Sequence, residues 1–172
     1  MDARYPVGEF VYPREAGAVE REVWIGEIAS LPQVLRELAE EIGEGRMERS
    51  YREGGWTARQ VIHHVADSHL NGYARQRLAL TEDTPVIKPY AEAEWARLED
   101  ARRMDVEVSL RLLESLHGRW VRLLRSLREE DFARGYVHPE VGGVVTLAQS
   151  VANYAWHGRH HAAHLRIILD GA

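Results

Sequence analysis

This chain places four of its nine histidines within eight consecutive residues: His157, His160, His161 and His164. Histidines four positions apart lie one turn apart on a helix, where two neutral imidazoles can bind one metal ion, as in helical H-x-x-x-H zinc sites. The stretch offers two such pairs, His157 with His161 and His160 with His164. A histidine-rich helix can also be no more than a solvated face, but four histidines in eight residues favour metal binding.

These histidines lie on a predicted amphipathic helix over residues 146–169. Thr146 and Gln149 form a capping-box pattern at its start, and Gly171 stands where a C-terminal cap is expected. The apolar residues that recur at helical spacing are Leu147, Val151, Tyr154, Ala155, Gly158, Ala162, Leu165 and Leu169.

The helical phase separates the two histidine pairs. His157 and His161 continue a row that starts at Tyr154 and borders the apolar face. His160 and His164 fall further round the helix. The pair His157/His161 is therefore better placed to meet a ligand from another helix.

A second amphipathic helix, predicted over residues 57–80, carries three more histidines and opens with another capping box, T-A-R-Q. His63 stands four residues before Asp67 on the polar face, which predicts an exposed pair. His69 lies near the centre of the apolar face, where a hydrogen-bonded core histidine is the alternative to a ligand. His64 lies on the flank. Periodicity prefers His64 and His69 over His63 as a third ligand and does not choose between them.

Apolar spacing predicts two further long helices and a short one. The first covers residues 18–44, where Pro32 either starts a second helix or kinks a single one. The third long helix covers residues 106–127, with a short helix before it at 92–99 and one more turn at 130–132.

An extended arm and a hairpin complete the chain. Residues 1–16 contain two prolines and scattered aromatic side chains, which predict an arm that packs on the domain. Residues 136–145 are the only strand candidate and predict a small β-hairpin before the last helix. Together the pattern indicates one all-α domain over residues 1–172, a four-helix bundle in which facing helices build a metal site.

Four other polar residues lie outside this predicted site. His117 is predicted to pack on the third long helix, and His138 to lie in a loop. Arg75 and Arg119 either face a substrate carboxylate or point to solvent.

Composition excludes several classes of protein. The 172 residues are 45% hydrophobic and 28% charged, as in ordinary globular domains, and the net charge of −5 argues against nucleic-acid binding. No apolar run approaches the roughly 20 residues needed to span a membrane, and no signal peptide is recognisable, so a cytoplasmic location is expected. Cysteine is absent. A metal must therefore be bound by histidine and carboxylate, and any reactive thiol must arrive with a substrate.

The combined motifs resemble a known family. GWTARQVIHHVADSHLN, LTEDTPVIKPY, LHGRW, YVHPE and NYAWHGRHHAAH are similar to the YfiT branch of the DinB-like superfamily, nearly from end to end. The resemblance implies a four-helix bundle with three histidines around one divalent metal ion per chain, zinc or nickel. It further implies a metal-dependent hydrolase or a thiol S-transferase that uses bacillithiol, mycothiol or glutathione, and a homodimer.

The resemblance also implies which histidines bind the metal. The family has one histidine in the second helix, followed by an aliphatic residue and Ala-Asp, which is His64 in this sequence. The last helix supplies two histidines four apart, here His157 and His161. The family pattern therefore selects His64 over His69. It gives neither His160 nor His164 a role as a ligand.

Three imidazoles leave an open position on the metal, which is typical of catalytic sites. A bound water would have its pKa lowered from 15.7 towards about 7, and a bound thiol would be deprotonated. A hydrolase usually also has a carboxylate base close to the water. Asp67 is the candidate, although it lies on the polar side, nearly a full turn beyond His64. Tyr154 could cover the metal, although a core role is favoured.

Three functions follow from these observations. The first is transfer of a small thiol of the bacillithiol type to an electrophilic substrate through a metal-bound thiolate, and it is favoured because the relatives are linked to bacillithiol. The alternative is hydrolysis of a small molecule by a metal-bound hydroxide. The second alternative is a non-catalytic metal-binding dimer module. No nucleic-acid or membrane partner is expected.

Overall fold

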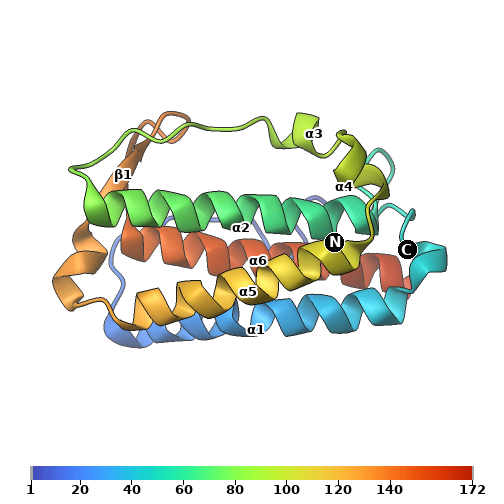
Figure 1. Ribbon diagram of the computed structural model, residues 1–172, viewed down its shortest axis with the longest axis horizontal. Coiled ribbons are helices and arrows are strands. Elements are labelled where there is room, and N and C mark those ends of the chain that lie inside the picture. The colour runs from blue at the N-terminus through green and yellow to red at the C-terminus, as the bar shows by residue number, and fades with distance from the viewer. Residues whose placement is uncertain (1, 172) are drawn as a thin grey trace.

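Four long helices form the body of the protein, and the computed structural model describes residues 2–171. The helices are α1 (Ala18–Ile42), α2 (Ala58–Thr81), α5 (Val106–Arg125) and α6 (Leu147–Asp170). All four run along the longest axis of the molecule (Figure 1). Because α1 and α2 each pack against both α5 and α6, the helices close a bundle. The predicted all-α four-helix bundle is confirmed.

Short elements connect the long helices. The chain between α2 and α5 crosses over the outside of α2 (Figure 1), and a two-stranded antiparallel hairpin precedes α6, as predicted. The short elements are η1 (Glu44–Arg46), α3 (Glu92–Trp95), α4 (Glu99–Arg103), η2 (Glu129–Ala133), β1 (Gly135–His138) and β2 (Gly143–Thr146).

Capping boxes begin the two histidine-bearing helices. In α2 the Gln60 backbone N–H donates to Thr57 Oγ1 at 3.2 Å, and the Thr57 backbone N–H donates to Gln60 Oε1 at 3.0 Å. Thr146 and Gln149 form the same reciprocal pair at the start of α6. Each box satisfies two backbone groups that a helix start otherwise leaves free, and so fixes where the helix begins.

Pro32 lies inside α1, which is one continuous helix rather than two. Proline has no backbone N–H, so the carbonyl of Ile28, four residues earlier, receives no hydrogen bond from position 32. Nδ1 of His117, from α5, lies 2.6 Å from that carbonyl oxygen. A side chain of a neighbouring helix thus occupies the acceptor that the proline leaves free.

The core has two apolar clusters, one towards each end of the bundle. Along α2, His69 lies between Ala66 of one cluster and Tyr73 of the other. Along α6, His157 lies between the same two clusters. The histidines are therefore at the middle of the bundle, where apolar packing gives way to polar side chains.

The arm predicted over residues 1–16 is described from residue 2 onwards and runs along α6. The backbone carbonyl of Pro13 accepts from Gln149 Nε2 at 3.1 Å, and that of Gly8 accepts from Trp156 Nε1 at 3.1 Å. The carbonyl of Ala3 lies 3.0 Å from Nε2 of His164. The arm therefore covers α6 from its first turn to its last third.

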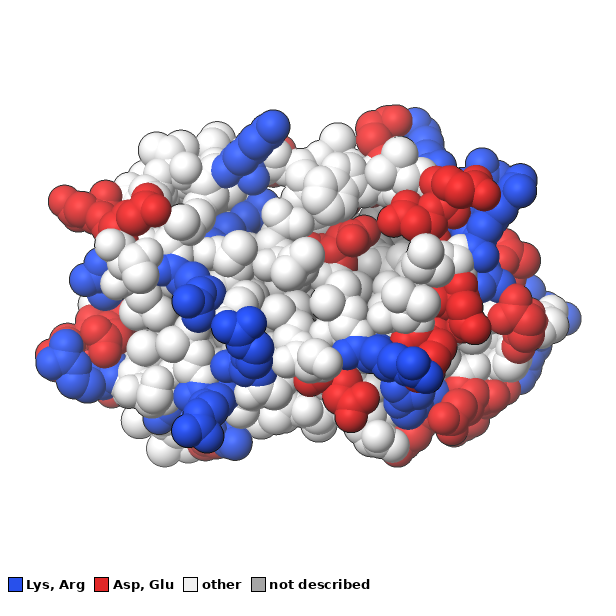
Figure 2. Space-filling model, in the orientation of Figure 1, with Lys and Arg blue, Asp and Glu red and all other residues white. Residues whose placement is uncertain are grey.

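The surface carries no long stretch of one charge on the face drawn in Figure 2. Acidic and basic side chains lie side by side at the right-hand end, where Figure 1 places α4. Among residues 2–171, no helix has both the length and the apolar character that crossing a membrane requires.

Candidate metal centre

Three histidines from two helices converge at the middle of the bundle. His64 comes from α2, His157 and His161 come from α6, and one ring nitrogen of each lies within 4.8 Å of the other two. Nε2 of His64 is 3.2 Å from Nε2 of His157. Two nitrogens that each bind a tetrahedral ion at roughly 2.0–2.1 Å lie about 3.3 Å apart, so the arrangement fits a metal ion. The three predicted positions come together; their role as ligands remains a prediction.

Burial keeps these three imidazoles neutral. It lowers the pKa of His64 to about 4 and that of His157 and His161 well below the ordinary value, and the neighbouring imidazoles lower each further. A neutral imidazole offers a nitrogen lone pair to a metal, whereas imidazolium does not. At neutral pH the three rings are therefore in the state that metal binding requires.

His69, the other candidate on α2, contacts the cluster through His157. Its Nε2 lies 3.1 Å from Nδ1 of His157, and its Nδ1 lies 3.0 Å from Nε2 of His117. Both His69 and His117 are buried, as expected of core residues. Their hydrogen bonds, however, join them to His157.

His160 and His164 are more buried than the helical phase predicts. They are 8% and 2% exposed, because the arm and Tyr51 cover this side of α6. Nδ1 of His164 lies 3.3 Å from Nδ1 of His161, and these two with His160 form a second group of close ring nitrogens. His160 stacks on Trp156, and its Nδ1 has no hydrogen-bond partner within residues 2–171.

Two other histidines differ from their predictions. His63 is buried rather than exposed, because the chain entering α5 covers it: Nδ1 lies 2.7 Å from Ser109 Oγ and Nε2 lies 3.1 Å from the Met104 carbonyl. It makes no pair with Asp67. His138 ends strand β1 and lines the pocket in front of the cluster, whereas the sequence predicts only a loop residue.

A pocket of about 460 Å³ opens onto the cluster. Trp56 forms part of its wall, with its ring centroid 4.5 Å from that of His64 and 6.3 Å from that of His161. The sequence offers one signal that Trp56 packs against α2, because it stands directly before the N-cap Thr57, where a large apolar side chain commonly packs on the first turns of the helix. The pocket-lining residues that sequence reasoning missed are Arg4, Tyr5, Tyr51, Arg52, Trp56, Ser68, Pro89, Tyr90, Glu92, Glu140, Asn153 and Trp156.

The two catalytic candidates, Asp67 and Tyr154, lie in different places. Asp67 is half-buried, which raises the pKa of its carboxyl to about 6, but it does not line the pocket. Tyr154 lines the pocket and is almost wholly buried against His69 and Trp120. Its ring lies so close to Gly72 that a Cβ there would stand 2.2 Å from Tyr154 Cζ. Tyr154 therefore packs in the core and also borders the pocket, and a role at the metal stays a prediction.

Acidification is expected to destabilise the metal-free protein between about pH 6.5 and pH 4. Burial lowers the pKa of His64, His117 and His164 from 6.5 to about 4, so the unfolded chain takes up protons before the folded one does. Stability from these groups is complete above pH 6.5 and is lost as the pH falls towards 4. The raised pKa of Asp67 makes the folded protein more stable as the pH falls, but this is one group against the three histidines.

Urea unfolding of chelator-treated protein at several pH values measures this effect. The urea midpoint should fall steadily over that range. A midpoint that stays constant from pH 7 to pH 4.5 would contradict the prediction.

The fold and the site thus define a helical bundle with a three-histidine candidate metal centre. Residues 27–165 match the model of the DinB superfamily, and the chain belongs to that superfamily. The resemblance inferred from the sequence is confirmed.

Similar proteins carry names that refer to metal. A protein of Bacillus licheniformis named "putative metal-dependent hydrolase" is 48% identical over 163 residues, which cover 95% of this chain and 93% of that protein. One of Halalkalibacterium halodurans with the same description is 49% identical and covers 98% of both chains. The solved structure of YfiT from Bacillus subtilis, described as "a probable metal-dependent hydrolase with an unusual four-helix bundle topology", superposes with a TM-score of 0.94. It is 40% identical, over 98% of this chain and 96% of that one.

Proposed function

We propose that this protein is a metal-dependent enzyme that transfers a small thiol to an electrophilic substrate at the His64, His157 and His161 cluster. The observation that carries the proposal is the convergence of three neutral histidines on an open pocket. An ion held by the three histidines would act as a Lewis acid and lower the pKa of a thiol or water that reaches it. Imidazole ligands suit zinc and nickel alike, and we propose one such ion per chain.

The carboxylates favour thiol transfer over hydrolysis. Within residues 2–171, no carboxylate joins the three-histidine group, and Asp67 lies off the pocket. The two glutamates that line the pocket, Glu92 and Glu140, are both exposed. A metal-bound water with a pKa of about 7 is only partly ionised at neutral pH and is commonly assisted by a base within hydrogen-bond reach, whereas a metal-bound thiol ionises outright and needs none. The names of the relatives favour hydrolysis, which stays the alternative.

The pocket wall can hold both substrates. Trp56 and Tyr51 give it apolar faces, and Arg4, Arg52 and Arg75 also line it, with Arg4 already paired to Asp2. Guanidinium groups bind carboxylates and other anions well, so an anionic thiol suits this pocket. In the reaction the thiol releases its proton to solvent and the resulting thiolate attacks an electrophilic carbon; the C–S bond forms as the leaving group departs with its electron pair.

Conjugation of a thiol to monochlorobimane tests the proposal. Zinc- or nickel-loaded protein is mixed with bacillithiol, or with glutathione for comparison, and the fluorescent conjugate is measured. The protein contributes no thiol of its own because it has no cysteine. Conjugation should depend on the metal, disappear in His64→Ala and persist in His63→Ala, since His63 is buried on the same helix but contacts Ser109 and Met104 instead.

The opposite result would redirect the proposal. No conjugation with either thiol, while the metal stays bound, would favour hydrolysis or a non-catalytic metal-binding module. A homodimer is also part of the proposal, and light scattering on the purified protein would test it.

A further inference from the structure

We propose that two buried sets of histidines fix the protonated nitrogen of His157 and of His161, so that Nε2 of each ring faces the metal without a proton. The His157 relay consists of His157, His69 and His117; the His161 relay consists of His161 and His164. The inference rests on the ligand role of His157 and His161 in the proposed function. It makes His69, His117 and His164 positioning residues.

The His157 relay takes its direction from a backbone carbonyl. Nδ1 of His117 lies 2.6 Å from the Ile28 carbonyl oxygen, which can only accept, so Nδ1 of His117 carries the proton. In a neutral ring the other nitrogen then accepts. Nε2 of His117 therefore accepts from Nδ1–H of His69, 3.0 Å away.

The same alternation of donor and acceptor assigns the proton of His157. Because Nδ1 of His69 donates, its Nε2 accepts, and the donor is Nδ1–H of His157 at 3.1 Å. The proton of His157 is thus on Nδ1. Its Nε2, which lies 3.2 Å from Nε2 of His64, is left with a free lone pair.

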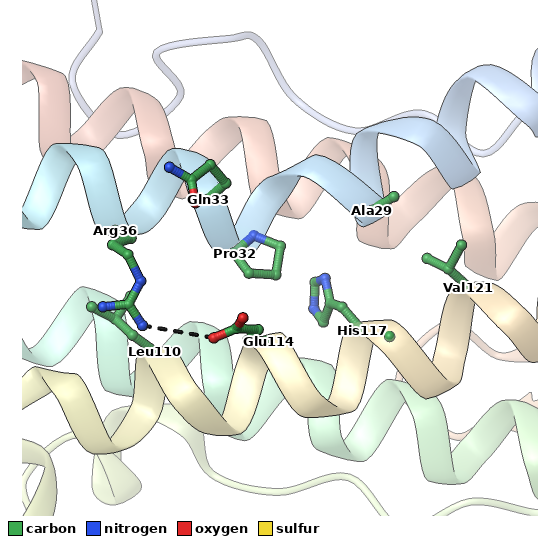
Figure 3. A pocket seen from close by; sticks show the side chains of 9 residues that line it. Ala29, Pro32, Gln33, Arg36, Leu110, Glu114, His117 and Val121 are labelled. Atoms are coloured by element: carbon green, nitrogen blue, oxygen red, sulfur yellow. Dashed lines mark ion pairs between the residues drawn. The ribbon is translucent and has the colours of Figure 1, made fainter.

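Pro32 keeps the anchoring carbonyl available. In an uninterrupted helix the N–H of residue 32 would bond to the Ile28 carbonyl, but proline has none. Figure 3 shows Pro32 of α1 beside His117 of α5, at a groove of about 320 Å³ on the side of the bundle formed by these two helices. Pro32 of α1 therefore helps to orient His157 of α6, through the Ile28 carbonyl, His117 and His69.

The His161 relay has the same design with a different anchor. Nε2 of His164 lies 3.0 Å from the Ala3 carbonyl oxygen of the arm, so Nε2 of His164 carries the proton. Its Nδ1 then accepts from Nδ1–H of His161, 3.3 Å away. This leaves Nε2 of His161 for the ion. Both ligands from α6 are therefore oriented by hydrogen bonds that end on a backbone carbonyl.

Such support changes metal affinity. A neutral imidazole can carry its proton on either nitrogen, and only one of the two forms binds through Nε2. A partner that accepts from Nδ1–H selects that form and holds the ring in place, and removing partners of this kind typically costs about 10–100-fold in affinity.

Nitrogen-15 NMR of the zinc-loaded protein tests the relay directly, because it reports which ring nitrogen carries the proton. The proposal expects Nδ1–H for His69 and His117, and Nε2–H for His164. The reverse form at His69 or at His164 would overturn the corresponding relay, whatever activity the protein shows.

Metal affinity tests its consequence. His69→Leu and His164→Leu should each weaken zinc binding about 10–100-fold in competition with a chelator. His69→Gln, whose amide can accept from His157 and donate to His117, should recover most of that loss. The matched control is His63→Leu, which removes a buried, hydrogen-bonded histidine from the same helix and should stay within about 2-fold of the wild-type affinity.

The outcomes separate this inference from the proposed function. Wild-type zinc affinity in both His69→Leu and His164→Leu would overturn the relays, as would a loss in His63→Leu equal to theirs. If His69→Leu does not fold, His164→Leu and the NMR assignments still decide. Absence of thiol transfer with the expected affinities and protonation would leave the relays standing and reject only the proposed reaction.

Discussion

Replacing His64, His157 or His161 by alanine is expected to abolish tight metal binding. Each substitution removes a nitrogen from a group whose members lie within 4.8 Å of one another, and two ligands do not hold a divalent ion firmly. The loss of affinity should exceed the roughly 10–100-fold that removal of a supporting residue costs. Bound metal per chain after dialysis, together with chelator competition, measures it.

Two other histidines serve as controls. His63→Ala changes a buried residue of α2 that contacts Ser109 and Met104, and His160→Ala changes a neighbour of His161 that stacks on Trp156. Both variants should retain the metal. Equal metal loss in His160→Ala and His161→Ala would contradict the assignment and favour the second histidine group.

Trp120→Ala is expected to lower the free energy of unfolding by about 3–5 kcal/mol, which is large for one substitution. Trp120 is fully buried, and its Nε1 donates to Gln76 Oε1 at 2.7 Å. Gln76 in turn donates to Ser150 Oγ at 2.9 Å, and Tyr136 Oη lies 3.1 Å from the same oxygen. Removing the indole leaves a cavity, and it leaves the amide oxygen of Gln76 without its donor in a buried chain of hydrogen bonds.

Urea unfolding of three variants separates these contributions. Trp120→Phe keeps most of the volume but not the N–H, and should cost about 1–3 kcal/mol. Trp95→Ala, at a position 38% exposed, should cost under about 1 kcal/mol. A loss in Trp120→Ala no larger than in Trp95→Ala would show that the network contributes little to stability.

Local sequence signals predicted most of the fold. The capping boxes at Thr57 and Thr146 placed the starts of α2 and α6 correctly, because a cap depends only on residues three positions apart. Helical phase and family resemblance placed His64, His157 and His161, which the structure brings together.

Long-range contacts account for what the sequence did not predict. His63 looks exposed on its own helix, yet Ser109, 46 positions later, covers it. His164 looks polar-facing, yet the carbonyl of Ala3, 161 positions earlier, closes over it. Helical periodicity describes one helix at a time and cannot show which distant segment covers its polar side.

The position of Trp56 gives the protein a built-in optical reporter. Its ring centroid lies 4.5 Å from that of His64 and 6.3 Å from that of His161, so an ion bound by these histidines would be close to a fluorophore. Paramagnetic ions such as nickel or cobalt quench indole emission at such range, whereas zinc, with a filled d shell, has no such effect. Emission during a titration would therefore distinguish ions that bind equally tightly. Trp56→Phe would remove the share of the quenching that comes from this residue and leave the three histidines in place, while the four other tryptophans would still emit.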